Sequence, residues 1–169
     1  TLRTKAALAA LEAVASVPGA IPGVGTVVTP EQMEAAKNAG AQFAVSPGHT
    51  AKLLDAADAL DMPYLPGAAT PAEMQGLMER GYTNLKFFPA EASGGAAYLK
   101  NFATVFQNIR FCPTGGVSLK NMGEYLSLPN IDVVGGSWVA PKSAVAAGNW
   151  DELTALAKDA IKTAHAITA

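Results

Sequence analysis

The sequence predicts an α/β protein built as a (β/α)8 TIM barrel. Short apolar segments alternate with helical patterns along the whole chain, and each apolar segment ends in Gly, Pro, Ser or Thr. Such alternation is typical of a parallel sheet covered by helices. The polar and glycine-rich residues follow the carboxyl ends of the strands, where barrel enzymes build their sites, and no turn carries the G-x-G-x-x-G dinucleotide fingerprint. These observations favour a barrel over a doubly wound sheet.

Six segments have the composition of strands that are buried on both faces. Each is a short apolar run followed by a tight loop, which is typical of strands in a parallel sheet. The six segments span residues 20–28, 41–48, 62–69, 83–90, 109–116 and 131–138.

Helices are expected between these strands, and several have clear start signals. Thr29-Pro30 and Thr70-Pro71 each place Thr at the N-cap and Pro at the first helical position. A long amphipathic helix is expected from Asn149 to about residue 166. The residues expected on its apolar face are Leu153, Leu156, Ala160 and Ile161.

The strand count falls short of a closed barrel. A (β/α)8 barrel needs eight strands and about 200–250 residues, whereas this chain has 169 residues. The segment Thr1–Thr4 passes directly into a helical pattern over residues 5–17, and therefore resembles the tail of a strand. We expect one barrel domain over residues 1–169, truncated at the N-terminus, with the first strand–helix unit and most of the second strand absent from this chain.

Composition and charge exclude several classes of protein. The formal net charge is −2 and only 15% of the residues are charged, so no basic surplus is present to bind nucleic acid. No apolar run approaches the roughly 18 residues of a membrane span, and the first residues do not resemble a signal peptide. Cys112 is the only cysteine, which excludes a disulfide within the chain. We expect a cytoplasmic protein, with neither nucleic acid nor membrane as a partner.

Lys86 stands in an apolar run, the segment NLKFFPAEASGG of residues 84–95. One interpretation is structural: the stem packs on apolar surface while the ammonium reaches water or pairs with Glu91. The other is chemical, because a desolvated amine with a lowered pKa is a nucleophile that forms Schiff bases with carbonyl compounds. These twelve residues alone do not decide between the two interpretations.

Two glycine pairs stand at the ends of the last two predicted strands. They are Thr114-Gly115-Gly116 and Gly135-Gly136-Ser137. Glycines let backbone N–H groups approach an anion closely, and the loops after the last strands of such barrels often bind a phosphate. We predict an anion site here, with Ser137 as the side chain that contributes to it.

The remaining reactive residue types give weaker signals. His49 follows a strand and His165 lies on the last helix, so the two histidines do not form a metal-binding constellation. We expect Cys112 to be a buried structural thiol, and Trp138 and Trp150 to be packing residues.

Five motifs in order along the chain carry a family resemblance: VGTV, GAQFAVSPG, FFPAE, RFCPTGG and GGSW. Together they resemble the 2-keto-3-deoxy-6-phosphogluconate (KDPG) aldolase family, some of whose members also cleave 4-hydroxy-2-oxoglutarate. The resemblance runs from Thr1 to the final helix. It implies a class I pyruvate aldolase on a (β/α)8 barrel, which is a homotrimer, needs no metal or other cofactor and serves the Entner–Doudoroff pathway.

The resemblance also assigns roles to residues. It implies that Lys86 forms the Schiff base with the keto carbon and that the chain releases pyruvate and glyceraldehyde 3-phosphate from KDPG. The pyruvate end would be bound by Arg3, Thr26, Phe88 and Thr114, and the phosphate end by Gly115, Gly116, Gly136 and Ser137.

One family residue has no counterpart in this chain. The resemblance places the proton-shuttling carboxylate four residues before Arg3, upstream of Thr1. Glu91 is not expected to replace it, because it follows Pro89 on a loop and is expected to cap the next turn. Two alternatives stay open: a phosphate-binding isomerase or synthase in which Lys86 is only a charge, and a non-catalytic split or engineered scaffold.

Overall fold

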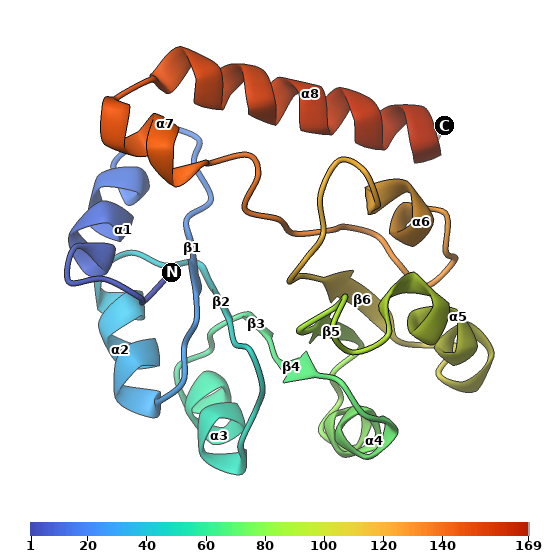
Figure 1. The fold of residues 1–169 in the computed structure, drawn as a ribbon. Helices are drawn as coiled ribbons and strands as arrows, with labels where there is room; N and C mark the ends of the chain where they lie inside the picture. Colours follow the sequence, from blue (N-terminus) through green and yellow to red (C-terminus); the bar gives the residue numbers. More distant parts are fainter. Residues whose placement is uncertain (169) are drawn as a thin grey trace. The chain divides into compact units, whose positions relative to one another are not determined.

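The protein has an α/β fold in which short strands alternate with helices (Figure 1). The computed structural model describes residues 1–168. The chain divides into two compact units, the first comprising residues 1–76 with 84–86 and the second comprising residues 77–83 with the chain from 87 onward. The described strands form two three-stranded sheets, with the orders β1-β2-β3 and β4-β5-β6.

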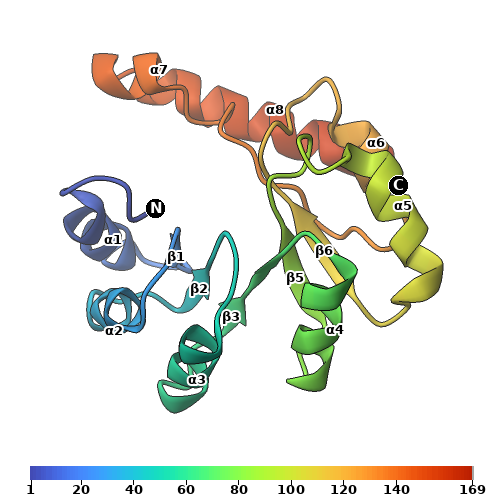
Figure 2. The same ribbon diagram turned by 60° about the horizontal axis from the view of Figure 1, so that its bottom comes forward.

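The first unit is a run of strand and helix pairs. Its strands β1, β2 and β3 are parallel, with Val24 opposite Ala44 and Ala44 opposite Tyr64. Helices α1, α2 and α3 lie together on one side of this sheet in both ribbon views (Figures 1 and 2). The elements are α1 (Ala7–Ala15), β1 (Gly23–Gly25), α2 (Pro30–Asn38), β2 (Phe43–Val45), α3 (Ala51–Ala59), β3 (Tyr64–Leu65) and β4 (Gly67–Ala68).

Small aliphatic side chains form the core of the first unit. Val27, Met33 and Ala36 are completely buried. They belong to one cluster of buried apolar residues from the strands and from the faces of α1, α2 and α3, namely Leu11, Val24, Val27, Met33, Ala36, Ala39, Ala41, Ala44, Leu53, Ala57 and Met62. Alanine on these helix faces lets the helices approach the sheet closely.

The second unit has an aromatic core. Phe102 packs edge to face against Tyr98, with ring centroids 4.7 Å apart, and also contacts Phe106 and Phe111. Helix α8 packs against α6 and α7 (Figure 1). The elements are β6 (Arg110–Pro113), α5 (Gly95–Val105), α6 (Met122–Leu126), α7 (Lys142–Ala147) and α8 (Trp150–Thr168). Two further elements, α4 (Pro71–Glu79) and β5 (Asn84–Phe87), contain the boundary between the units.

The predicted helix starts at Thr29 and Thr70 are confirmed. The Thr29 hydroxyl accepts a hydrogen bond from the N–H of Gln32 at 3.3 Å. Thr70 and Glu73 form a capping box, because the Thr70 N–H donates to Glu73 Oε2 at 2.9 Å and the Glu73 N–H donates to the Thr70 hydroxyl at 3.4 Å. The amides at the helix start thus have partners, and the chain changes direction at these residues.

Two sequence predictions about the elements are wrong. Residues 1–4 form a turn rather than the tail of a strand, although the Leu2 N–H donates to Gly25 O at 2.9 Å. The predicted strand 131–138 is reduced to two parallel bridges, Phe111–Ile131 and Thr114–Gly135, because Val133 is 53% exposed and the run is not buried on both faces. Ile161, predicted on the apolar face of α8, lines a cavity together with Ala160 and residues of α6, and is 58% exposed.

Within residues 1–168, no helix combines the length and the apolar character needed to cross a bilayer.

Candidate functional site

Lys86 is buried in strand β5, as the apolar run predicts. Only 8% of its surface is exposed, and its neighbours Leu85 and Phe87 are completely buried. Within the first unit, the Lys86 N–H donates to Pro66 O at 2.9 Å, which fixes the backbone of the lysine beside the preceding strand. An amine in such surroundings is poorly hydrated, and desolvation disfavours its charged form. The position therefore suits a nucleophilic amine.

Arg3 and Thr26 meet in the first unit. The Arg3 Nε donates to the Thr26 hydroxyl at 3.3 Å. Thr26 follows β1 with φ of +65°, a left-handed conformation that is a genuine outlier for a β-branched residue. Strained residues of this kind occur mostly where a ligand must be held.

The loop Thr114–Gly116, which we call the glycine loop, has its carbonyl groups bound by the protein. The N–H groups of Ala90 and Glu91 donate to the carbonyls of Thr114 and Gly115 at 2.8 and 3.1 Å. The amide of Asn121 donates to the carbonyl of Gly116 at 3.2 Å. Gly115 and Gly116 have φ of +95° and +85°, in the left-handed region that favours glycine.

The second glycine pair lies beside the glycine loop in the second unit. Thr114 and Gly135 form a parallel bridge, and the Gly135 N–H donates to Pro113 O at 3.0 Å. Gly135 has to be small here, since a Cβ atom at this position would lie 2.6 Å from the Thr114 methyl group. The Thr114 hydroxyl is buried without a hydrogen-bond partner among the described residues. A buried hydroxyl in this state is a candidate contact for a ligand.

The other predicted residues of the second unit surround these two loops. The Phe88 ring lies against Gly115, where a Cβ atom would be 3.2 Å from the ring. Gly136 faces the Trp138 ring even more closely, because a Cβ atom on Gly136 would lie only 1.7 Å from that ring. Phe88 is half-buried and Ser137 is exposed. The structure therefore brings Phe88, Thr114 and both glycine pairs together.

Sequence reasoning missed Tyr125, whose role depends on the fold. Tyr125 is completely buried on α6 and its hydroxyl donates a hydrogen bond to Glu91 Oε1. Burial raises the pKa of the Tyr125 phenol, and the hydrogen bond to Glu91 raises it further, so the phenol is protonated at neutral pH. The expected capping role of the Glu91 side chain is thus wrong, although its backbone carbonyl does accept from the N–H of Gly94 at 3.2 Å.

The histidines, Cys112 and Trp150 give weaker signals in the sequence. His49 Nδ1 lies 2.8 Å from Gly67 O, and His165 is exposed on α8. Cys112 is half-buried rather than buried. Trp150 is 62% exposed, so its prediction as a packing residue is wrong. Among residues 1–168, no three side chains of His, Cys, Asp or Glu are grouped as metal ligands would be.

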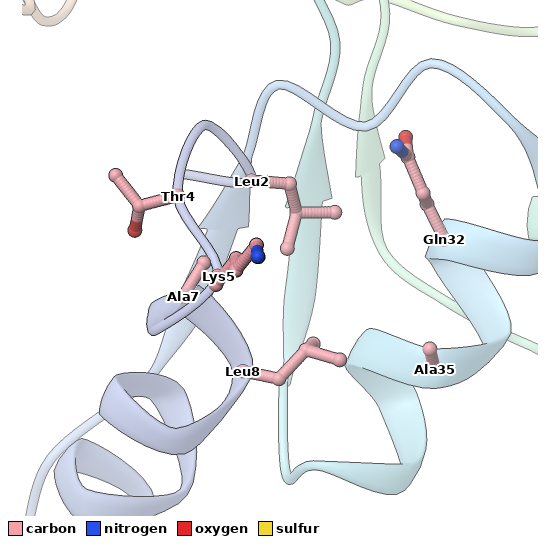
Figure 3. Close-up of a pocket in the computed structure, with 7 residues that line it drawn as sticks. All are labelled: Leu2, Thr4, Lys5, Ala7, Leu8, Gln32 and Ala35. Carbon is pink, nitrogen blue, oxygen red and sulfur yellow. The ribbon is translucent and has the colours of Figure 1, made fainter.

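Two cavities lie near predicted residues, and Lys86 lines neither of them. The first, of about 250 Å³, lies between the N-terminal turn and α2, and Figure 3 shows Leu2 and Leu8 pointing toward α2. Lys5 is the charged residue of its lining. The second, of about 480 Å³, is lined by Gly135, Gly136 and Trp138 together with residues of α6 and α8.

Each unit, taken by itself, holds residues with a distinct chemical capability. The first unit holds a buried lysine, Lys86, and an arginine, Arg3, bound to a strained threonine. The second holds two adjoining glycine pairs and the buried hydroxyl of Thr114. A poorly hydrated amine attacks carbonyl carbons, and backbone N–H groups at glycine-rich loops bind anions.

Comparison with known proteins identifies relatives with this chemistry. The model of the KDPG and KHG aldolase family matches residues 1–156. The 2-dehydro-3-deoxy-phosphogluconate aldolase of Pseudoalteromonas atlantica is 50% identical over 168 residues, which are 99% of this chain and 78% of the relative.

Solved structures give the same result. The KDPG aldolase of Legionella pneumophila, with pyruvate captured as a covalent carbinolamine intermediate, has a TM-score of 0.89 at 46% identity, over 92% of this chain and 76% of that one. The corresponding aldolase of Zymomonas mobilis, with 3-phosphoglycerate, has a TM-score of 0.87 at 45% identity, over 94% and 75% of the two chains.

Proposed function

Because the chain belongs to the KDPG and KHG aldolase family, we propose that it cleaves 2-keto-3-deoxy-6-phosphogluconate to pyruvate and glyceraldehyde 3-phosphate. The protein is a class I aldolase, a carbon–carbon lyase that works through a Schiff base. The observation that carries this proposal is the burial of Lys86 in β5. Cleavage of 4-hydroxy-2-oxoglutarate to pyruvate and glyoxylate is proposed as a second activity of the same site.

In the proposed mechanism, Lys86 attacks the keto carbon of the substrate. The amine adds to C2, water leaves, and a protonated imine forms. A base removes the proton of the C4 hydroxyl, the C3–C4 bond breaks, and its electrons move into the imine. The aldehyde is released, the resulting enamine takes up a proton, and water hydrolyses the imine to give pyruvate.

The other predicted residues hold the two ends of the substrate. Arg3 and Thr26 bind the carboxylate of the pyruvate half, with Phe88 and Thr114 lining its pocket. This assignment is supported by the hydrogen bond between Arg3 and Thr26 and by the buried hydroxyl of Thr114. The amides of the two glycine pairs and the Ser137 hydroxyl bind the phosphate, which is supported by the adjoining positions of the pairs.

We propose that the fold is of the (β/α)8 barrel class, supported by the likeness to the solved aldolases. The homotrimer and the cytoplasmic location stay predictions. Sedimentation of the purified protein tests the trimer.

Borohydride trapping tests the role of Lys86. Incubation with pyruvate and borohydride should add the mass of one reduced pyruvate to the peptide that contains Lys86. Lys86→Arg should lose this modification and about 10⁴-fold or more of the turnover, because a guanidinium cannot form the imine. Modification of a different lysine would contradict the assignment.

Retained turnover in Lys86→Arg would favour the isomerase or synthase alternative, in which Lys86 serves only as a charge. Lys100→Arg is a matched control, because Lys100 is exposed on α5. This control should keep both the modification and the activity.

A further inference from the structure

Glu91 lies directly against the glycine loop. A Cβ atom on Gly116 would be only 2.5 Å from Glu91 Cγ and 2.7 Å from Glu91 Cβ. The Glu91 N–H also donates to Gly115 O at 3.1 Å. Both the side chain and the backbone of Glu91 therefore determine where the glycine loop lies.

The bound carbonyls orient the amides of the loop. The carbonyls of Thr114, Gly115 and Gly116 all accept hydrogen bonds from the protein. In a trans peptide the N–H points opposite to the C=O of the preceding residue. The N–H groups that follow these carbonyls therefore point away from the groups that bind the carbonyls. Within residues 1–168, the amides of Gly115 and Gly116 donate to no backbone carbonyl. These amides are therefore available to an anion.

Tyr125 closes a ring of contacts around the loop. Gly116 O is bound by Asn121, which immediately precedes α6, and Tyr125 lies one turn further along that helix. The Tyr125 hydroxyl donates to Glu91, whose N–H in turn holds Gly115 O. Gly95 borders this pair, because a Cβ atom there would lie in ordinary contact with it, 3.5 Å from the Glu91 carboxylate and 3.6 Å from the Tyr125 hydroxyl.

We propose that Glu91 and Tyr125 form a positioning pair that sets how tightly the glycine loop binds the substrate phosphate. The inference rests on the proposed function of the glycine loop. The pair does not touch the substrate; the Tyr125 hydroxyl fixes the Glu91 side chain, which lies against Gly116, and the Glu91 N–H holds the carbonyl of Gly115. Because the amides are oriented through those carbonyls, loss of the pair weakens phosphate binding before it affects the chemistry at the keto carbon.

The test compares two substrates that differ only in the phosphate, KDPG and 2-keto-3-deoxygluconate. Tyr125→Phe should raise KM for KDPG about 10-fold with little change in kcat, because a misplaced binding group costs affinity. The value of kcat/KM for 2-keto-3-deoxygluconate should change by less than about 2-fold. Glu91→Ala should have the same effects, and Glu91→Gln should restore KM, because the amide oxygen also accepts from Tyr125.

The double variant Tyr125→Phe with Glu91→Ala should be no worse than either single variant, as two residues that act through one contact are not additive. Equal losses for both substrates in the single variants, or no change in KM for KDPG, would overturn the proposal. If Tyr125→Phe does not fold, the exposed Glu91 still provides the test. Failure of pyruvate trapping on Lys86 in the unaltered protein would instead overturn the proposed function.

Discussion

Lys86 and the glycine loop are both prepared for a ligand, but by opposite means. Lys86 is buried, as are Leu85 and Phe87, which flank it in strand β5. Gly116 in the loop is exposed, and its position depends on hydrogen bonds to carbonyl groups and on left-handed backbone angles. A nucleophilic amine needs surroundings that disfavour its charged form, whereas an anion needs donors that point at it.

The comparison predicts that the two regions respond differently to small changes. An added methyl group near Lys86 can be accommodated by small shifts of the neighbouring side chains. The same methyl group in the loop meets a backbone angle that only glycine adopts easily. The following predictions test this difference, in order of decreasing effect.

Gly116→Ala should give the largest effect. The added Cβ atom would lie 2.5 Å from Glu91 Cγ at a φ of +85°, so the loop and Glu91 must both shift. We expect kcat/KM for KDPG to fall about 10²-fold, the loss typical of a binding group displaced by 1 Å. Steady-state kinetics measure this loss.

Gly76→Ala is the matched control for Gly116→Ala. Gly76 lies inside α4, and a Cβ atom there meets nothing within 4 Å. Alanine is the better helix former, so this control should gain up to about 1 kcal/mol of stability and keep its activity. Equal activity of the two alanine variants would show that the loop does not need its left-handed glycine.

The sequence identified both regions, but not what supports them. Lys86 and the glycine pairs are visible as local patterns, a lysine in an apolar run and glycines at strand ends. Tyr125 is not visible in this way, because it meets Glu91 across 34 residues and has the pattern of an ordinary apolar position in a short helix. The partner of a loop residue depends on how the chain folds, which no local pattern contains.

The predicted strands show the same limit at the level of the backbone. Apolar runs located β5 and β6 correctly, since these runs are buried. The run 131–138 has a similar composition, yet Asp132 turns outward to Arg110 and Val133 is exposed. Composition predicts where a strand can form, whereas pairing along its length decides whether it does.

Thr26→Gly should give an intermediate effect, in which stability rises and activity falls. The substitution relieves a φ of +65° that a β-branched residue adopts at a cost, so the free energy of unfolding should rise by about 1 kcal/mol. It also removes the hydroxyl that accepts from Arg3, so kcat/KM should fall about 10-fold. Thermal unfolding and steady-state kinetics measure the two changes.

Asp61→Gly is the matched control for Thr26→Gly. Asp61 has a φ of +48° and is exposed beyond the end of α3. Relief of its backbone angle should raise stability without a loss of activity. If both variants were more stable and equally active, the strain at Thr26 would have no connection with substrate binding.

Asp132→Asn should give the smallest effect, because it removes an ion pair at the surface rather than a positioned ligand group. Asp132 pairs with Arg110, and both side chains are about half exposed, at 52% and 43%. The hydrogen bonds from Arg110 lower the pKa of the Asp132 carboxyl below its usual value. A lowered pKa contributes stability above the unfolded pKa of about 4, and this contribution is lost as the pH falls through the folded value. We therefore expect Asp132→Asn to lower the free energy of unfolding by about 0.5 kcal/mol at pH 7, measured by urea unfolding. The variant and the unaltered protein should have equal stability below about pH 3. A difference that persists at that pH would mean that Asp132 acts through packing rather than through charge.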